Sequence, residues 1–374
     1  MAPIDGTCDP HFAAVRDAFA ANFDAGREVG ASFAASVDGR VVVDVWGGHA
    51  DAARTRPWQH DTIVNVFSTT KAMTTTCAHL LVERGLLDVD APVARWWPEF
   101  AAAGKENLPV RYLLSHQAGL AALRTPLPVE ALYDWPRLTT ALAGESPWWE
   151  PGTASGYHAI TFGYLVGEVV RRITGRTLGA FFRDEMAGPL DADFHIGLAP
   201  STDTRVAEMI APSTTGLSAG GPAATPDPES LMAKVLGNPR VTPSVANQPA
   251  WRRAEIPAAN GHGNARSVMR VMTALACGKL LHPDTLARAT EEQWLGKDIV
   301  LGFKMRWGLG FMLSHDAMPL GGPRAFGHGG WGGSLGIADP DARVAWSYVM
   351  NKMSPGTTGD SRAAGPLAAL YAAL

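Results

Sequence analysis

FSTTKAMTTTCAHLLVERG, residues 67–85, is the stretch from which the fold of this chain can be worked out. It predicts a helix that begins near Ser68 and ends at Gly85. Lys71 follows Ser68 by three residues, so the helix would carry both on one face. Amide groups at a helix N-terminus stabilise negative charge, and a lysine kept neutral by burial can take a proton from a serine hydroxyl. A capping serine beside a solvated lysine is the alternative interpretation.

Two other serines match the Gly-x-Ser-x-Gly pattern of nucleophilic serines: Ser218 in GLSAG and Ser334 in GGSLG. A serine of that kind needs a strand before it and a helix after it. Ser218 stands in residues 213–228, which are rich in Gly, Pro, Ser and Thr and predict a loop. Ser334 precedes a strand, a turn and a second strand. We therefore interpret both matches as chance.

Strands are predicted towards both ends of the chain. Residues 30–48 indicate two strands joined by a hairpin at Asp38 and Gly39. After residue 265 a helix precedes several strand-like segments, and a final helix closes the chain. The two ends should therefore combine into one antiparallel sheet that carries helices, which is an α+β plan.

The middle of the chain differs from the two ends in composition and in predicted secondary structure. From about residue 90 to 260, prolines and tryptophans are frequent, helical segments recur and strands are hard to find. We predict a discontinuous sheet domain of residues 1–95 and 261–374, and a mainly helical domain of residues 96–260. The cleft between them is the expected site.

Composition and charge exclude several functions. The 374 residues are 46% apolar and 18% charged, with a net charge of -4 and no block of like charge, so neither nucleic acid nor a membrane is an expected partner. The N-terminus lacks the features of a secretory signal, and we expect a cytoplasmic protein. Cys8, Cys77 and Cys277 are too scattered for a disulfide framework or a zinc site.

Three longer segments carry a resemblance to a known family: residues 67–100, residues 110–120 (VRYLLSHQAGL) and residues 151–182, which begin PGTASGYHAI. Together they resemble the serine β-lactamase and penicillin-binding-protein superfamily. Within it, the chain is most similar to the family VIII carboxylesterases, which resemble class C β-lactamases. The resemblance extends from about residue 30 to residue 351, and it implies the β-lactamase/transpeptidase-like fold.

The resemblance also implies roles for individual residues. Ser68 would be the nucleophile, Lys71 its activating partner, and Tyr157, in GYHA, would exchange protons with Lys71. The third element of the family, Lys-Thr-Gly in the lactamases, would correspond to His328, Gly329 and Gly330.

This alignment of the third element keeps the spacing to the turn at Asp339 and Pro340. A competing alignment uses Trp331, Gly332 and Gly333. In the first alignment, the backbone N–H groups of Ser68 and Trp331 would form the oxyanion hole.

The chain departs from the lactamase pattern at two positions. Ala159 replaces an asparagine, and His328 replaces a lysine, so two groups that hold a lactam or peptide substrate are missing. The resemblance therefore implies a serine carboxylesterase that hydrolyses short-chain esters through an acyl-enzyme on Ser68, without metal or cofactor. The alternatives are a β-lactamase or D-Ala-D-Ala peptidase, an acyltransferase, and a silent ligand-binding relative.

Four further residues are candidates for the wall of the substrate pocket: His158, His262, Trp148 and Trp251. Ordinary hydrogen-bonded histidines and buried core tryptophans are the alternative interpretation of these positions.

Overall fold

The computed structural model describes residues 3–212, 227, 229–356 and 358–374. Ser218 and almost all of the predicted loop around it lie outside the described residues.

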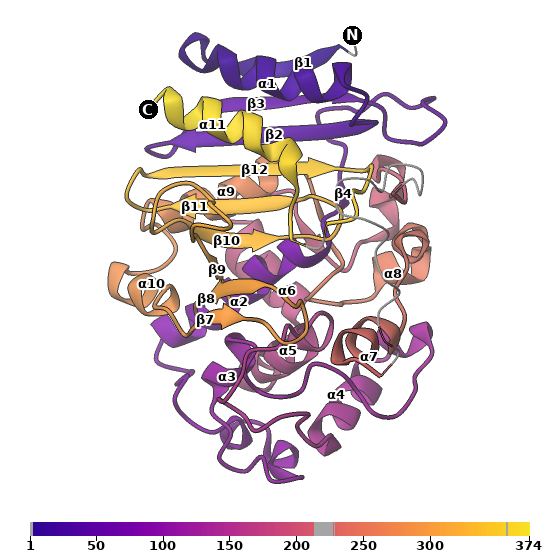
Figure 1. Cartoon of the computed structure of the whole chain (residues 1–374), viewed down its shortest axis with the longest axis vertical. Helices are drawn as coiled ribbons and strands as arrows, with labels where there is room; N and C mark the ends of the chain where they lie inside the picture. The colour runs from indigo at the N-terminus through magenta and orange to yellow at the C-terminus, as the bar shows by residue number, and fades with distance from the viewer. Residues whose placement is uncertain (1–2, 213–226, 228, 357) are drawn as a thin grey trace.

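Strands from both ends of the chain form one antiparallel sheet of nine strands (Figure 1). Its order is β1-β3-β2-β12-β11-β10-β9-β8-β7. The bounds are β1 Ile4–Cys8, β2 Gly30–Val37, β3 Arg40–Gly48, β7 Trp294–Lys297, β8 Lys304–Trp307, β9 Met312–Leu313, β10 Phe326–Gly329, β11 Leu335–Asp339 and β12 Val344–Met350. The predicted hairpin is confirmed, because Asp38 and Gly39, both at positive φ, connect β2 to β3.

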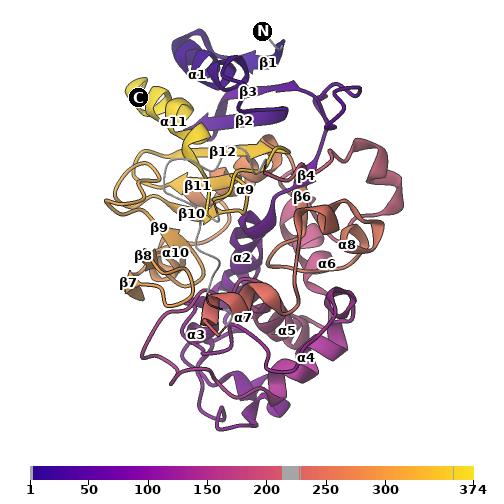
Figure 2. The same ribbon diagram turned by 45° about the vertical axis from the view of Figure 1, so that its right-hand side comes forward.

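Alternation along the strands gives this sheet two covered faces. Phe33 of β2 packs near Tyr348, which contacts Phe19 of helix α1, Ala13–Asp24. The preceding residue, Ser32, lies on the other face. Its hydroxyl accepts a hydrogen bond from the first amide of α9, Ala265–Ala276. Helix α11, Ala364–Ala372, lies beside α1, so these two helices cover one face and α9 covers the other (Figures 1 and 2).

The remaining helices lie beside and below strands β7 to β10 (Figure 2). They are α2 Thr70–Glu83, α3 Val110–Leu114, α4 Trp135–Gly144, α5 Thr161–Thr174, α6 Leu178–Phe182, α7 Leu231–Gly237, α8 Pro249–Arg253 and α10 Pro283–Ala289. A small second sheet has the order β4-β6-β5 and is formed by β4 Val64–Asn65, β6 Gly261–Gly263 and β5 His195–Ile196.

Helix α2 is the central element of this arrangement, because every residue from Thr70 to Leu81 is buried. It packs against α5, α6 and β10. A polar side chain on α2 therefore lies inside the protein, where water cannot satisfy it. This placement decides the environment of Lys71.

The α+β fold class expected from the sequence is confirmed by the mixed composition and the antiparallel sheet. The boundaries of a sheet domain and a helical domain stay a prediction. In the described ranges, no helix has both the length and the apolar character that crossing a membrane requires.

Candidate active site

Ser68 and Lys71 meet at the start of the buried helix. Ser68 lies in a short turn of 3-10 helix, Phe67–Thr69, that leads directly into α2. Lys71 Nζ lies 3.1 Å from Ser68 Oγ, as the three-residue spacing predicts. Phe67 has a φ of +42°, a strained conformation that packing must hold in place. The ring of Trp331, 5.1 Å from that of Phe67, supplies part of this packing.

The surroundings of Lys71 favour a neutral amine. The side chain is fully buried, and burial lowers the pKa of Lys71 well below the ordinary lysine value. Nζ lies 2.7 Å from the carbonyl oxygen of Ala159 and 3.1 Å from that of Ala258. A neutral amine has two hydrogens for these two carbonyls and keeps one lone pair. That lone pair can face the Ser68 hydroxyl and accept its proton.

Tyr157 completes this group. Its ring centroid lies 4.7 Å from Lys71 Nζ, and its hydroxyl has no hydrogen-bond partner among the described residues. Burial raises the pKa of Tyr157 above its usual range, and the nearby Ser68 hydroxyl partly opposes the rise. The phenol therefore stays protonated unless it passes its proton on. Its ring stacks on Trp307, with centroids 5.8 Å apart and planes 5° apart.

The third element borders the same group. His328 is fully buried on β10, and its ring centroid lies 6.1 Å from that of Tyr157. Its Nδ1–H donates to the carbonyl of Gly329 at 2.7 Å, which leaves Nε2 without a partner in the described structure. Burial and, second, the nearby Lys71 lower the pKa of His328 to about 3. The histidine is therefore neutral near pH 7 and does not replace the cation of the lactamase lysine.

The end of β10 closes tightly over the nucleophile turn. A Cβ atom on Gly330 would come within 2.2 Å of the Val66 carbonyl oxygen, so only glycine fits there. The backbone N–H groups of Ser68 and Trp331 have no hydrogen-bond acceptor among the described residues. The oxyanion hole expected at these two N–H groups stays a prediction. His328 lies beside Tyr157 and Trp331 lines the cavity, and the choice between the two alignments stays a prediction.

Ser68 and Tyr157 open into an apolar cavity of about 430 Å³. Apart from these two residues its walls carry apolar side chains. They come mainly from the nucleophile turn, from helix α7 and from the loop after β7: Phe67, Met232, Val235, Leu236, Val300, Leu301 and Phe303. Trp331 also lines the cavity.

The two histidines predicted for the pocket wall do not line this cavity. His158 is fully buried, and both of its ring nitrogens are satisfied: Nε2 accepts from the Leu120 amide at 3.0 Å, and Nδ1–H donates to Gly156 at 2.7 Å. His262 is buried in the small sheet and donates to the Asn260 carbonyl at 2.7 Å. His158 is thus an ordinary hydrogen-bonded core histidine, and His262 belongs to a strand.

The two tryptophans predicted for the wall lie elsewhere as well. Trp251 is fully buried, and its indole N–H donates to Asn65 at 2.9 Å. Trp148 packs under the Arg124 guanidinium, 4.1 Å from the ring, and donates to the Ala122 carbonyl. In both cases the tryptophan supports the scaffold.

Ser334 is close to the nucleophile but does not line the cavity. It is 1% exposed, and its Oγ donates to the Val66 carbonyl at 2.7 Å and lies 2.9 Å from Thr69 Oγ1. The hydroxyl thus ties the β10–β11 turn to the start of α2.

Asp298 is a neighbour of Tyr157 that the sequence did not reveal. Its carboxylate accepts hydrogen bonds from the amides of Tyr157, Val300 and Leu301 at 2.9 to 3.0 Å. It thereby joins the tyrosine to the loop that walls the cavity. Burial raises the pKa of Asp298, and these amides oppose the rise. The sequence feature that could have drawn attention to Asp298 is its position as a single acidic residue directly before the apolar segment IVLGF, residues 299–303.

Comparisons with known proteins agree with this geometry. The family model described as Beta-lactamase matches residues 15–371. The chain is 38% identical over 365 residues to Esterase/beta-lactamase LipL of Mycobacterium tuberculosis, covering 94% of this chain and 83% of that protein. It is 29% identical over 335 residues to Esterase EstB of Burkholderia gladioli, covering 83% and 82%. A solved family VIII carboxylesterase has a TM-score of 0.93 and 44% identity, with full coverage of both chains.

Proposed function

Since this chain belongs to the β-lactamase family, we propose that it is a serine carboxylesterase that hydrolyses esters through an acyl-enzyme on Ser68. One observation carries the proposal. A buried lysine, whose two hydrogen-bonded carbonyls satisfy a neutral amine, lies 3.1 Å from a serine hydroxyl that opens into an apolar cavity. The relatives named esterase and carboxylesterase support the ester as the substrate.

The chemistry follows from the positions of the groups. Ser68 Oγ attacks the ester carbonyl carbon while Lys71 Nζ accepts the hydroxyl proton. The carbonyl oxygen becomes an oxyanion, which the backbone N–H groups of Ser68 and Trp331 stabilise. When the C–O bond of the leaving group breaks, the alkoxide takes a proton from Tyr157, which Lys71 reprotonates. Water then attacks the acyl-enzyme by the same steps and releases the acid and Ser68.

The cavity favours an uncharged substrate. No charged side chain is among its described lining residues. Ala159 and the neutral His328 stand where the lactamases carry an amide and a cation. The volume of about 430 Å³ is near the lower end of the range for small-molecule pockets. We infer compact, short-chain esters rather than lipids.

Two alternatives use the same scaffold. A β-lactamase or D-Ala-D-Ala peptidase needs recognition of a substrate carboxylate, for which the described cavity wall offers no cation. An acyltransferase would differ only in the acceptor that attacks the acyl-enzyme, and the two activities separate when an added alcohol competes with water. The cytoplasmic location stays a prediction.

The test is a panel of p-nitrophenyl esters from acetyl to palmitoyl, hydrolysed by the wild-type protein and by Ser68→Ala. We expect turnover that is fastest for the short acyl chains and absent in the variant. A rate that climbs steadily to palmitoyl would contradict the short-chain assignment. Turnover in Ser68→Ala equal to wild type would contradict the mechanism.

A further inference from the structure

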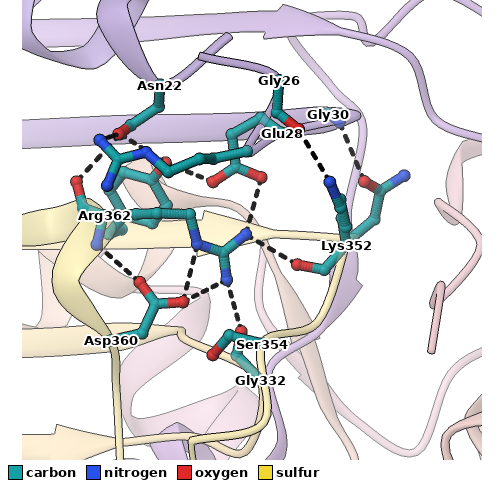
Figure 3. Close-up of polar contacts among 12 residues, drawn as sticks. Asn22, Gly26, Glu28, Gly30, Gly332, Lys352, Ser354, Asp360 and Arg362 are labelled. Atoms are coloured by element: carbon teal, nitrogen blue, oxygen red, sulfur yellow. Dashed lines mark hydrogen bonds and ion pairs between the residues drawn. The ribbon is translucent and has the colours of Figure 1, made fainter. Parts of the chain in front are cut away.

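A buried arginine holds the turn that carries Trp331 (Figure 3). Arg362 precedes helix α11 and is 5% exposed. Its Nη2 donates to the carbonyl oxygen of Gly332 at 2.6 Å. Gly332 directly follows Trp331, whose N–H is the second proposed oxyanion donor. The cation therefore bonds the residue next to Trp331, and Arg362 is not among the described residues that line the cavity.

The guanidinium has an acceptor for each of its five N–H groups (Figure 3). Nη1 donates to Glu28 at 2.9 Å and to the Lys352 carbonyl at 2.8 Å. Nε donates to Asp360 at 2.7 Å, and Nη2 pairs with the same carboxylate in addition to its bond to Gly332. Because the guanidinium is planar and all five of its N–H groups are hydrogen-bonded, its orientation is fixed. Its bond to the turn is thus fixed by four bonds to other parts of the chain.

Arg362 shares the support of this turn with backbone hydrogen bonds. Gly332 and Gly333 have φ values of +92° and +129°, which leave the backbone few restraints of its own. The Gly332 amide donates to Gly356 at 2.9 Å, and its carbonyl also accepts from the Ser354 amide at 2.9 Å. A Cβ atom on Gly333 would lie 2.6 Å from Arg362 Nη2, so the guanidinium fills the space behind the turn.

We propose that Arg362 is a positioning residue of the active site, which sets the direction of the Trp331 backbone N–H by holding the carbonyl of Gly332. The inference rests on the proposed function, since it concerns the oxyanion hole of that reaction. Arg362 does not touch the cavity. It acts through the turn between Gly330 and Ser334.

This role has a kinetic signature. An oxyanion donor bonds the substrate more strongly in the tetrahedral transition state than in the ground state, so its loss lowers kcat and leaves KM nearly unchanged. Formation and breakdown of the acyl-enzyme both pass through an oxyanion, and kcat should fall whichever step is slower. If Arg362 only stabilised the fold, its substitution would lower the melting temperature without lowering kcat at unchanged KM.

Arg362→Lys is the informative variant. Its ammonium keeps a positive charge between Glu28 and Asp360, but it has three donors and no planar fork, so it cannot replace all five contacts of the guanidinium. Removal of an oxyanion donor lowers kcat by about 10² to 10³-fold. Arg362→Lys should only displace the donor, so we expect its kcat to fall by about 10-fold or more, with KM within about two-fold of the wild-type value. Steady-state kinetics on p-nitrophenyl acetate and a thermal unfolding curve give both quantities.

Glu28→Gln is the matched control. It removes a buried charge from the same network but leaves Arg362 bonded to Gly332 and Asp360. We expect a lower melting temperature, with kcat within about two-fold of wild type. Wild-type kcat in Arg362→Lys, or an equal loss of kcat in Glu28→Gln, would overturn the proposal.

If Arg362→Lys does not fold, Asp360→Asn carries the test, because Asp360 Oδ2 binds both Nε and Nη2 of the guanidinium. Its kcat should fall at unchanged KM, and wild-type kcat would overturn the proposal. The failure of the proposed function is distinct from these outcomes, because a wild-type protein without ester turnover would refute the esterase itself.

Discussion

The Lys71 amine faces the ring of Tyr157, with Nζ 4.7 Å from the ring centroid, and both side chains are buried. The same nitrogen lies 3.1 Å from Ser68 Oγ. One buried amine thus connects the proposed nucleophile with the proposed proton shuttle. Because the two titratable groups are coupled, any pKa seen in kinetics belongs to the pair.

The activity should rise from acid to mildly alkaline pH. Protonated Lys71 cannot accept the Ser68 proton, so the active form is the deprotonated one and activity is lost as pH falls. Burial lowers the pKa of Lys71 well below the lysine range, which places the rise at lower pH than a solvated lysine would. His328, with a pKa of about 3, stays neutral throughout and adds no step. The measurement is kcat/KM from about pH 5 to about pH 9, and a flat profile with an intact fold would contradict the lysine base.

Lys71→Met should keep the shape of the buried side chain and remove the base. We expect kcat/KM for p-nitrophenyl acetate to fall about 10² to 10⁴-fold, the usual contribution of a general base. The variant also leaves the carbonyls of Ala159 and Ala258 without their donor, so stability should fall as well.

Lys105→Met is the matched control for this substitution. Lys105 is 1% exposed and also donates to three backbone carbonyls, of Ala102, Ala143 and Glu145, but it does not line the cavity. It should lose stability and retain kcat/KM. Equal activity losses in both variants would show that Lys71 acts through folding alone.

Ser334→Ala should behave as a structural change. The hydroxyl donates to the Val66 carbonyl, which also accepts from the Thr69 amide at 3.2 Å, so its loss removes one buried hydrogen bond at a cost of about 0.5 to 1.5 kcal/mol. Urea unfolding measures that cost. Ser347→Ala, which loses a similar buried bond to the Leu335 carbonyl, is the control away from the site. The kcat of Ser334→Ala should fall far less than that of Ser68→Ala, and an equal loss would make Ser334 a nucleophile candidate again.

β-Lactam turnover should be slow beside ester turnover. The described cavity wall has neither an amide side chain nor a cation to hold the lactam amide and carboxylate. The measurement is kcat/KM for nitrocefin and for p-nitrophenyl acetate with the same preparation, with Ser68→Ala as the blank for both. A nitrocefin value equal to or above the ester value would reverse the assignment.

Local patterns in the sequence predicted part of this site. The spacing of Ser68 and Lys71 and the glycine that ends their helix are local features, and the structure agrees with them. Tyr157 and His328 were found only through family resemblance, because nothing local in the sequence says that they meet across the fold. The partners of Lys71 are backbone carbonyls of Ala159 and Ala258, which no residue type can reveal.

The pocket wall was predicted poorly for a physical reason. An aromatic or histidine side chain is large enough to belong to a core or to a cavity, and the sequence does not say which face it takes. Trp251 and His158 satisfy their nitrogens inside the scaffold. Part of the wall is formed by aliphatic residues of α7, such as Val235. The sequence of α7 resembles that of any buried helix, so it does not indicate a cavity.

The most direct measurement is the position of a covalent adduct after reaction with a fluorophosphonate, located by mass spectrometry of the digested protein. Ser68 is the only one of the three candidate serines shown to open into the described cavity beside a buried amine. We therefore expect the adduct on the peptide that contains Ser68. Ser68→Ala should give no adduct and lose ester hydrolysis by about 10⁴ to 10⁶-fold, on the scale of removing a triad nucleophile. An adduct on the peptide of Ser218 or Ser334, or a Ser68→Ala protein that still hydrolyses esters at the wild-type rate, would contradict Ser68 as the nucleophile.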